Sequence, residues 1–398
     1  MKWSSAVSDS HSFTEAVTEA SEQIRANLDG RQPDLAVVFV SSHHTSSYFT
    51  APEVFSQALG AKVLIGCSAT GVIGGGQEIE RSPGIAISAA LLPGIEISPF
   101  HLRQDELPSL DAAPGEWQTL LGFSADDCPA IMLLPDPFTL RSDHLLSGLD
   151  FAYPSTVKIG GLASGGGRPG TNAMFLNDKC VRSGAVGVAF IGELAVETVV
   201  AQGCRPIGEP IIVTDSELNV ISRLGDQTPL EVLRDLFKRA TTREKRLIRR
   251  SLQIGIVMDR LAADQSEGNF LIRNVLGADE KDGTLAVGEL IQEGQVVQFF
   301  VRDAQAADED LRMMLEEYID TLDGDTPTSA LLFSCLGRGQ YLYGTPDHDT
   351  NMFTDMVADI PIAGFFSNGE IGPIGDQTFL HGYTASFALF KQPAKADS

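Results

Sequence analysis

The sequence predicts an α+β protein of two related domains, in which layered mixed or antiparallel sheets carry flanking helices. Three observations predict this class. Short apolar runs separated by turn residues indicate buried strands, one helical segment accompanies each group of strands, and the same order of elements recurs along the chain. The chain of 398 residues is also long for one hydrophobic core, so two domains are expected.

The first repeated unit begins after a helix predicted over residues 14–28, where apolar side chains recur at helical spacing. Pro33 interrupts that pattern, and LAVVFV from Leu35 to Val40 is typical of a buried strand. A helix, a strand, a glycine loop and a further strand are then expected over residues 52–59, 62–65, 66–75 and 84–92.

A second copy of this order lies near the C-terminus, and its glycine loop has the same sequence pattern. GCSATGVIGG from Gly66 to Gly75 and GFFSNGEIGP from Gly364 to Pro373 both read G-x-x-x-x-G-x-I-G. Internal duplication explains this better than chance, because the same elements flank both loops. In the C-terminal copy these elements are expected over residues 330–333, 353–358, 360–363 and 383–390.

A weaker copy lies between these two, around the loop GGLASGGG that ends at Gly167. Its elements are expected over residues 130–134, 144–149, 157–159 and 185–191. We also expect a fourth, most diverged copy over residues 251–302, and four copies arranged as two pairs would give two similar domains.

The junction between the domains is expected at residues 202–229, which are rich in glycine and proline and contain a predicted hairpin over residues 211–221. The predicted domains are therefore residues 1–220 and 221–398. A helix with proline in its first turn is expected from Pro229 to Lys238.

Composition limits the partners of this chain. The net charge of −24 repels nucleic acid and anionic lipid, so the basic stretch from Lys238 to Arg250 is interpreted as a solvated helix face. The five cysteines form no C-x-x-C pair, which favours a reducing compartment and no structural zinc. No apolar run has the length of a membrane helix, so a cytoplasmic location without membrane insertion is expected.

The glycine loops do not fit known cofactor motifs. Val72 and Ile73 stand where a phosphate loop needs Lys and Ser or Thr, and Glu370 would repel a phosphate. GGGRPG, which ends at Gly170, leads into a predicted strand rather than the helix that would hold a pyrophosphate. Because H-E-x-x-H and G-x-S-x-G are also absent, the sequence predicts no cofactor, no metal and no hydrolase elbow.

A polar cluster follows two strands of the C-terminal copy. The loop SCLGRG from Ser334 to Gly339 presents Arg338, whose planar fork suits a carboxylate. If the neighbouring strand is adjacent, Asn368 and Glu370 can line the same cavity. An Arg beside an acceptor Glu is what an amino-acid-like zwitterion needs, and an Arg338–Glu370 salt bridge that only joins two loops is the alternative.

The expected ligand-binding residues come from this cluster and from the matching loop of the N-terminal copy. They are Cys335, Arg338, Gly339, Ser367, Asn368, Gly369, Glu370, Cys67, Ser68, Thr70 and Gly71. Cys335 could instead be a nucleophile, since a nearby Arg lowers the pKa of a thiol, but its histidine base is not evident and a small buried cysteine is the favoured interpretation.

These stretches resemble the FIST family of paired N-terminal and C-terminal domains. The N-terminal resemblance lies in LIGCSATGVIGGG from Leu64 to Gly76 and in SPGIAI from Ser82. The C-terminal resemblance lies in FSCLGRG from Phe333 to Gly339, in PIAGFFSNGEIGP from Pro361 to Pro373 and in Thr384. It extends from about residue 30 to 390.

The resemblance implies a sensory module for signal transduction that binds small ligands such as amino acids. Members are often fused to an output domain, whereas this chain leaves no length for one, so a separate partner protein is expected to carry the signal. A non-enzymatic sensor is the first hypothesis. A thiol enzyme using Cys335 and an interaction scaffold with Phe365 and Phe366 exposed are the alternatives.

Overall fold

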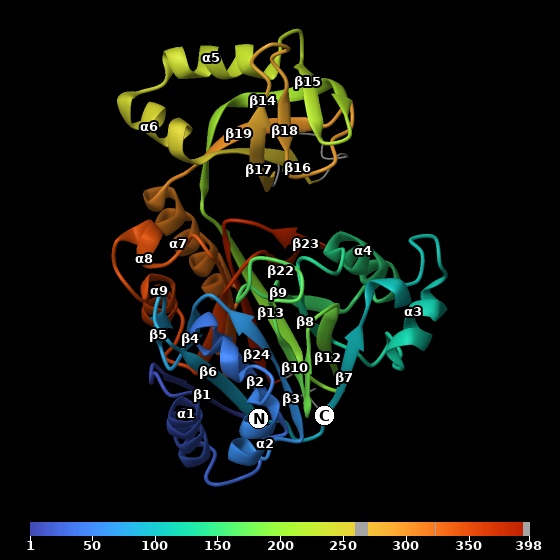
Figure 1. Ribbon diagram of the computed structural model, residues 1–398, viewed down its shortest axis with the longest axis vertical. Coiled ribbons are helices and arrows are strands. Elements are labelled where there is room, and N and C mark those ends of the chain that lie inside the picture. The colour runs from blue at the N-terminus through green and yellow to red at the C-terminus, as the bar shows by residue number, and fades with distance from the viewer. Residues whose placement is uncertain (259–269, 323, 393–398) are drawn as a thin grey trace. The chain divides into compact units, whose positions relative to one another are not determined.

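A computed structural model describes residues 1–258, 270–322 and 324–392. The chain forms two compact units (Figure 1). The first comprises Met1–Ala201, Leu311–Leu380 and the chain from Thr384 onward, and the second comprises Gln202–Asp310 with His381–Tyr383. Mixed sheets with flanking helices confirm the expected fold class. Within the described ranges, no helix is both long enough and apolar enough to cross a membrane.

The first unit contains three copies of one strand–helix–strand–hairpin–strand order. The sequence predicted this order with a glycine loop in place of the hairpin. The first copy and its flanking elements are β1 (Lys2–Ser8), α1 (Phe13–Asn27), β2 (Leu35–Ser41), η1 (Ser42–Ser47), α2 (Ala51–Leu59), β3 (Val63–Ala69), β4 (Val72–Gly74), β5 (Gln77–Ile79), β6 (Ile85–Leu91) and β7 (Glu96–Leu102). The helix α1 begins where Ser12 accepts a hydrogen bond from the Glu15 amide, which satisfies one open donor of its first turn.

The other two copies repeat this order. The second contains η2 (Gln104–Glu106), α3 (Pro114–Leu121), β8 (Ala130–Pro135), α4 (Ser142–Ala152), β9 (Val157–Gly161), β10 (Met174–Leu176), β11 (Lys179–Val181), β12 (Ala185–Ile191) and β13 (Ala195–Gln202). The third contains β20 (Ser329–Cys335), α8 (Gln340–Tyr343), α9 (His348–Met356), β21 (Ile362–Ser367), β22 (Glu370–Ile374), β23 (Gln377–His381) and β24 (Thr384–Lys391).

Each copy gives its hairpin to the sheet of another copy. The three six-stranded sheets have the orders β1-β6-β2-β3-β10-β11, β23-β22-β9-β8-β12-β7 and β13-β24-β20-β21-β4-β5. The hairpin of the second copy therefore joins the first sheet, that of the third joins the second, and that of the first joins the third. This cyclic exchange makes the three copies one unit with approximate threefold symmetry.

The first glycine of each repeated loop has one structural role in all three copies. It lies on the strand that pairs in parallel with the first strand of its copy, where the two backbones approach closely. A Cβ atom would lie 2.0, 1.9 or 1.8 Å from the facing carbonyl oxygen at Gly66, Gly160 and Gly364 respectively. Only glycine fits such an approach, which explains why the sequence repeats it.

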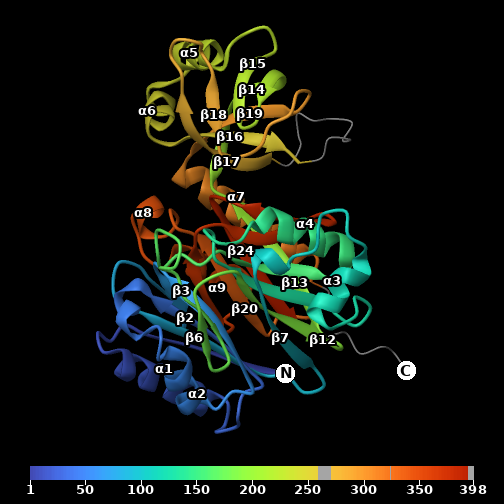
Figure 2. The same cartoon turned by 45° about the vertical axis from the view of Figure 1, so that its right-hand side comes forward.

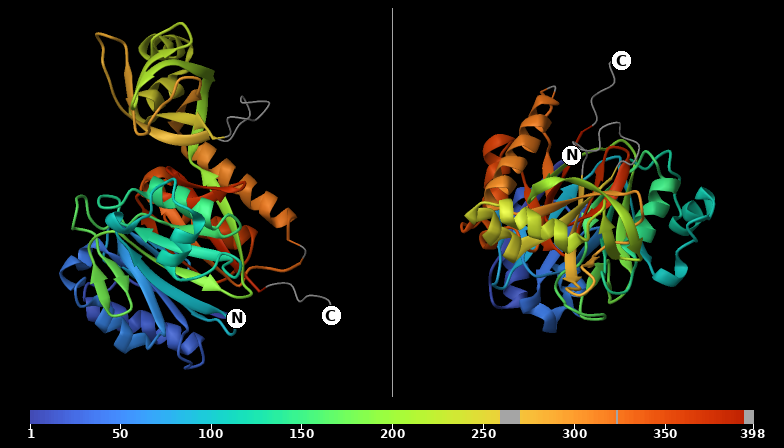
Figure 3. Two further views of the ribbon diagram at one scale, coloured as in Figure 1. Left: turned by 90° about the vertical axis from the view of Figure 1, so that its right-hand side faces the viewer. Right: turned by 90° about the horizontal axis from the view of Figure 1, so that it is seen from above.

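The three sheets share a central core and carry helices on their outer faces. Rings from different copies meet in this core, where Phe39 and Phe365 stack with centroids 4.8 Å apart. The helices α1 and α2 cover the outer face of the first sheet, drawn in blue in Figure 2. The cyan helices α3 and α4 lie across the second sheet (Figure 3, left), and α9 packs on the third.

The second unit is a closed barrel in the order β14-β15-β18-β17-β16-β19 with two helices. Val232 and Leu236 of one helix and Ile248 of the other pack against its interior residues. Its elements are β14 (Cys204–Glu217), β15 (Val220–Leu224), α5 (Pro229–Arg239), α6 (Thr242–Ser251), β16 (Leu252–Val257), β17 (Phe270–Ala278), β18 (Leu285–Val287) and β19 (Val296–Arg302), followed by α7 (Ala304–Asp320), which runs from the second unit into the first.

The expectation of a fourth copy over residues 251–302 is wrong. The described part of this segment supplies antiparallel barrel strands and contains no parallel pair with a crossover helix, while residues 259–269 lie outside the described residues. The hairpin expected near residues 211–221 and the helix expected from Pro229 are confirmed. The boundary at residue 220 stays a prediction.

Candidate functional site

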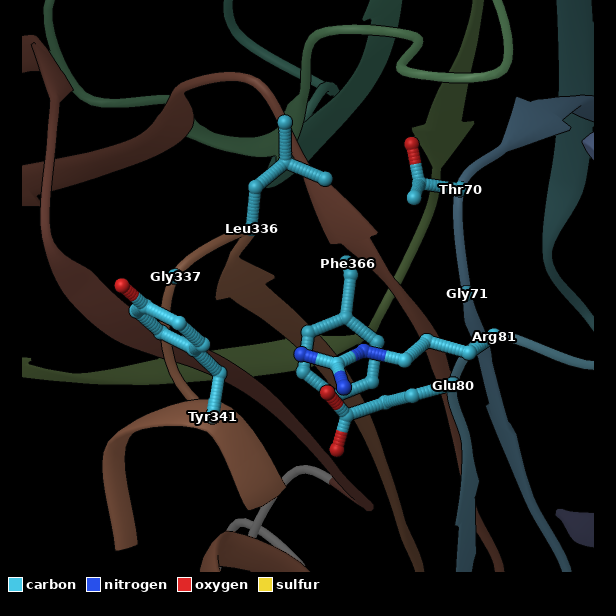
Figure 4. A pocket seen from close by; sticks show the side chains of 8 residues that line it. All are labelled: Thr70, Gly71, Glu80, Arg81, Leu336, Gly337, Tyr341 and Phe366. Atoms are coloured by element: carbon cyan, nitrogen blue, oxygen red, sulfur yellow. The ribbon is translucent and has the colours of Figure 1, made fainter.

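A cavity of about 360 Å³ lies in the first unit where the first and third copies meet. The antiparallel pairing of β4 with β21, in which Val72 faces Phe365, brings the hairpin of one copy to the sheet of the other. Figure 4 shows the residues that surround it. They are Thr70, Gly71, Glu80, Arg81, Leu336, Gly337, Tyr341 and Phe366.

Strand ends and turns position these side chains. Thr70 and Gly71 form the turn between β3 and β4, and Glu80 and Arg81 follow β5. Leu336 and Gly337 leave the end of β20, whereas Tyr341 lies on the short helix α8 and Phe366 on β21. The wall of the cavity is therefore made by loops and the short helix α8, and the floor by the strand β21. Binding sites are commonly built from loops that a scaffold of strands positions.

The second copy holds the turn at Thr70 in place. The Thr70 amide donates to Ser164 Oγ at 3.0 Å, and Thr70 Oγ1 donates to the Ser164 carbonyl at 2.6 Å. Ser164 Oγ in turn donates to the carbonyl of Phe366. All three copies thus meet beside the cavity through hydrogen bonds that fix its rear wall.

Glu80 and Arg81 bring opposite charges to one side of the cavity. Glu80 is half-buried and accepts a hydrogen bond from the Gln340 amide at 2.7 Å. Burial raises the pKa of Glu80, while that amide and the Arg81 charge oppose the rise. Arg81 is exposed and has a positive φ of 54°. Figure 4 shows both side chains reaching inward from the side opposite Tyr341.

Gly339 allows the third-copy loop to approach Glu80. Its φ is +64°, and a Cβ atom there would lie 2.4 Å from the Glu80 carboxylate. Any larger residue would therefore displace the carboxylate from the Gln340 amide.

Arg338 does not line the cavity, although it was expected to present its fork to a ligand. Its side chain is 0% exposed. Nε donates to Asp349 Oδ2 at 2.8 Å and Nη2 donates to Asp349 Oδ1 at 3.0 Å, so the fork is already occupied by a carboxylate of this chain. Nη2 also donates to the Tyr343 hydroxyl at 2.6 Å. The buried atom Nη1 has no hydrogen-bond partner among the described residues.

Glu370 is fully buried behind the loops and is held by hydroxyl groups. Ser367 Oγ donates to Oε1 at 2.6 Å and Thr384 Oγ1 donates to Oε2 at 2.7 Å. Burial raises the pKa of Glu370 to about 7, although these donors and the Arg338 charge oppose the rise. Arg338 and Glu370 therefore influence one another electrostatically, but the two-bond partner of Arg338 is Asp349.

A third buried carboxylate, Glu78, lies on β5 of the first copy. Its Oε1 accepts hydrogen bonds from the Thr350 amide at 2.9 Å and from the Thr350 hydroxyl at 3.2 Å. Burial, followed by the Asp349 charge, raises the pKa of Glu78 to about 8. Its buried Oε2 has no hydrogen-bond partner among the described residues.

The remaining sequence-predicted residues are spread around this region. Thr70 and Gly71 line the cavity, as expected of the N-terminal loop. Cys67 is buried in the central core, and burial raises the pKa of its thiol. Ser68 accepts a hydrogen bond from the Ala173 amide, away from the cavity wall.

The third-copy residues also take separate positions. Cys335 is half-buried at the end of β20, directly before the cavity residue Leu336. Asn368 is exposed, and its amide donates to the Leu162 carbonyl. Gly369 precedes β22. Ser367 donates a hydrogen bond to Glu370 and does not line the cavity.

Sequence reasoning missed Glu80, Arg81, Leu336, Gly337, Tyr341 and Phe366 as wall residues. One signal could have found Arg81. RSPG at residues 81–84 and RSG at residues 182–184 both follow the hairpin of their copy, with Arg81 two residues after β5 and Arg182 directly after β11. Phe365 and Phe366 are 0% and 2% exposed, so the apolar patch that would have favoured a scaffold is not found there.

Two family models match the chain. The FIST N domain matches residues 34–227 and the FIST C domain matches residues 229–373. An uncharacterized protein of Mycobacterium tuberculosis is 40% identical over 384 residues, which cover 96% of this chain and 98% of that protein. An uncharacterized protein of Mycobacterium bovis is 39% identical over 376 residues, or 94% and 95% of the two chains.

Among solved structures, a cyanuric acid hydrolase from A. caulinodans gives a TM-score of 0.36 at 8% identity, with 99% of each chain covered. Another cyanuric acid hydrolase structure gives 0.34 at 8% identity, with 98% and 99% covered. A likeness at this level carries no argument about fold or chemistry. The two family models and the curated relatives, in contrast, span most of the chain. The chain belongs to the FIST family, whose N and C domains are sensory domains of signal transduction.

Proposed function

We propose that the first unit is a non-enzymatic sensor that binds a small zwitterionic molecule, of the amino-acid type, in the cavity between the first and third copies. The observation that carries this proposal is the pairing of Glu80 with Arg81 on one side of a 360 Å³ cavity. An acceptor and a planar cationic donor, placed side by side, match the ammonium and carboxylate groups of such a ligand.

The cavity also offers an apolar place for the rest of the ligand. Phe366 is 2% exposed and forms part of the floor, and Leu336 lies on the wall with 38% of its surface exposed. A few polar groups beside apolar side chains are the usual composition of a small-molecule site. This assignment moves the carboxylate-binding role from Arg338 to Arg81, because the fork of Arg338 is already bound to Asp349.

Ligand binding would reach the surface through Gln340. Its amide donates to Glu80, and the next residue, Tyr341, is 71% exposed on the helix α8. A ligand ammonium that draws the Glu80 carboxylate toward itself would weaken the bond to Gln340 and shift this helix. We propose that a separate signalling protein recognises this change in the position of α8.

The test is a melting-temperature screen of the full chain with a panel of free amino acids. A ligand that binds the folded state raises the melting temperature by mass action. Arg81→Met should abolish that rise. Arg31→Met is the matched control, because Arg31 is an exposed arginine in the first unit whose side chain lies 3.7 Å from Asp29 and away from the cavity. A full response of Arg81→Met would contradict the site.

A thiol-dependent reaction at Cys335 is the second candidate, because this residue directly precedes the cavity wall and interacts electrostatically with Arg338. The test is alkylation with iodoacetamide near neutral pH, followed by mass spectrometry. If the protein is a non-enzymatic sensor, iodoacetamide should alkylate Cys335 no faster in the folded protein than in the urea-unfolded chain. Selective and faster alkylation in the folded state would favour the enzyme instead.

A further inference from the structure

The helix α6 carries a concentration of positive charge in an acidic chain. Seven basic side chains and one acidic side chain stand between Lys238 and Arg250, so this segment has a net charge of +6, whereas the whole chain has −24. None of the ten residues of α6 is buried. Figure 1 shows α5 and α6 in yellow beside the barrel of the second unit. The segment therefore presents a basic surface to solvent.

Other cations next to α6 are neutralised within the chain. Arg205 lies 3.2 Å from Glu244 and 3.3 Å from Asp303, and Arg243 lies 2.7 Å from Asp303. Four cations of α6, in contrast, form no hydrogen bond or ion pair with the residues that the structure describes. They are Lys245, Arg246, Arg249 and Arg250. Their charge is available to another molecule.

An aromatic ring positions two of these four cations. The ammonium nitrogen of Lys245 lies 5.7 Å and the guanidinium of Arg249 lies 5.1 Å from the centroid of Phe237 on α5. The ring attracts both cations through its face and accepts none of their hydrogen bonds in its plane, so their N–H donors stay available. The contact also limits the motion of the two side chains, which lowers the entropy lost when a partner binds.

The spacing of the four cations opposes the stability of α6. Lys245 and Arg249 stand four residues apart, as do Arg246 and Arg250, and like charges at this spacing repel one another on a helix surface. The helix dipole favours cations in the last turn, but Lys245 and Arg246 lie before it. Solvation explains why these side chains are exposed. It does not explain their spacing, which a negatively charged partner would turn into an attraction.

We propose that the basic face of α6, made of Lys245, Arg246, Arg249 and Arg250, binds a short acidic segment of a separate protein. The face limits the length of its partner, because a helix of ten residues is about 15 Å long. About five acidic residues in an extended segment cover this length. Nucleic acid or an anionic lipid surface would extend beyond the face and meet the acidic remainder of the chain, which repels it. This docking surface goes beyond the proposed function and does not depend on the cavity.

The experiment is a fluorescence-anisotropy titration of labelled hexaglutamate with the full chain. At about 0.1 M ionic strength the Debye length is about 10 Å, so the probe senses one surface rather than the charge of the whole chain. Hexaglutamate should bind, and hexaglutamine should not. Arg246→Glu combined with Arg250→Glu should weaken the binding of hexaglutamate roughly ten-fold or more, because the face then repels carboxylates.

The matched control is Arg31→Glu combined with Arg168→Glu, which makes the same change in net charge at two exposed arginines of the first unit. This control should bind hexaglutamate as the unmodified chain does. Absence of binding by the unmodified chain, full binding by the charge-reversed variant of α6, or equal weakening in the control would each overturn the inference.

A neutral variant separates the binding role from a role in the helix itself. Arg246→Gln combined with Arg250→Gln keeps side chains of high helix propensity and removes two charges. It should weaken the binding of hexaglutamate and leave the melting temperature unchanged or higher. A lower melting temperature would show that the cations stabilise the helix, and would overturn the inference.

Other occupants of the basic face have their own readouts. Tighter binding of hexathymidylate or of phosphatidylserine vesicles than of hexaglutamate would assign the face to nucleic acid or to lipid. A dimer in analytical ultracentrifugation that the charge-reversed variant abolishes would assign it to a second copy of this chain. Each of these results would overturn the inference. None of them involves an amino acid in the cavity, so the proposed function and this inference can fail separately.

Discussion

The guanidinium of Arg338 and the carboxylate of Asp349 form two parallel hydrogen bonds, 2.8 and 3.0 Å long, between side chains that are almost entirely buried. Burial opposes the ionisation of Asp349, but the Arg338 charge outweighs it and holds the pKa of Asp349 below its usual range. The pair ties the loop after β20 to the helix α9.

The first prediction concerns the loss of this pair. Arg338→Met leaves Asp349 buried without its cation, so the free energy of unfolding should fall by about 3–5 kcal/mol. The double variant Arg338→Met with Asp349→Leu should recover part of this loss, because no uncompensated charge remains. Urea denaturation measures both. If Arg338→Met is stable but no longer responds to ligand, Arg338 contacts the ligand and the structural role given to it here is wrong.

The second prediction concerns pH. The pKa of Glu370 is raised by burial from an ordinary 4.5 to about 7, and that of Glu78 to about 8. Between pH 4.5 and these raised pKa values, the folded state binds more protons than the unfolded state. Their stabilising contribution is therefore complete below pH 4.5 and is lost as the pH rises through 7 and 8.

Urea denaturation between pH 5 and 9 checks this dependence. Each fully linked proton should change the free energy of unfolding by about 1.4 kcal/mol per pH unit within its window. Glu370→Gln, which keeps the shape and removes the titration, should flatten the lower part of the curve. An unchanged slope in that variant would show that Glu370 ionises normally. The contribution of Asp349 stays constant over this range, because its pKa is lowered.

The sequence predicts those features of the fold that local residue patterns determine. The apolar runs and their order revealed three copies, and the helix beginning at Pro229 was visible from its cap. The exchange of hairpins between copies was not visible, because strand pairing such as Val72 with Phe365 joins residues far apart in the chain. Alternating apolar residues also occur in barrel strands, which is why residues 251–302 resembled a fourth copy.

The candidate site was predictable in its loops but not in its side chains. Thr70 and Gly71 were expected from the glycine motif and do line the cavity. Arg338 was expected to face a ligand, because the sequence does not tell which carboxylate a buried arginine meets. Asp349 lies in the first turn of α9 beneath the Arg338 fork, and no motif in the sequence pairs it with Arg338.

The third prediction concerns the close approach of β20 and β21. Gly364→Ala would place a Cβ atom 1.8 Å from the Leu332 carbonyl oxygen, and a backbone atom cannot move aside cheaply. The variant should lose several kcal/mol of stability, about as much as the severe core substitutions. Gly115→Ala is the control, since nothing lies within 4 Å of that position on α3. Equal melting temperatures for the two variants would contradict the proposed role.

The fourth prediction concerns the buried ring of Tyr48, over which the Arg182 guanidinium lies. Tyr48→Ala should cost about 3–5 kcal/mol, because it leaves a hole among buried side chains below Arg182. p-Cresol should enter this hole and raise the melting temperature of the variant more than that of the unmodified protein. The saturated analogue 4-methylcyclohexanol should rescue less, since it offers the Arg182 guanidinium no π face. If p-cresol shifts the melting temperatures of both proteins equally, the hole left by Tyr48→Ala does not accept a free ring.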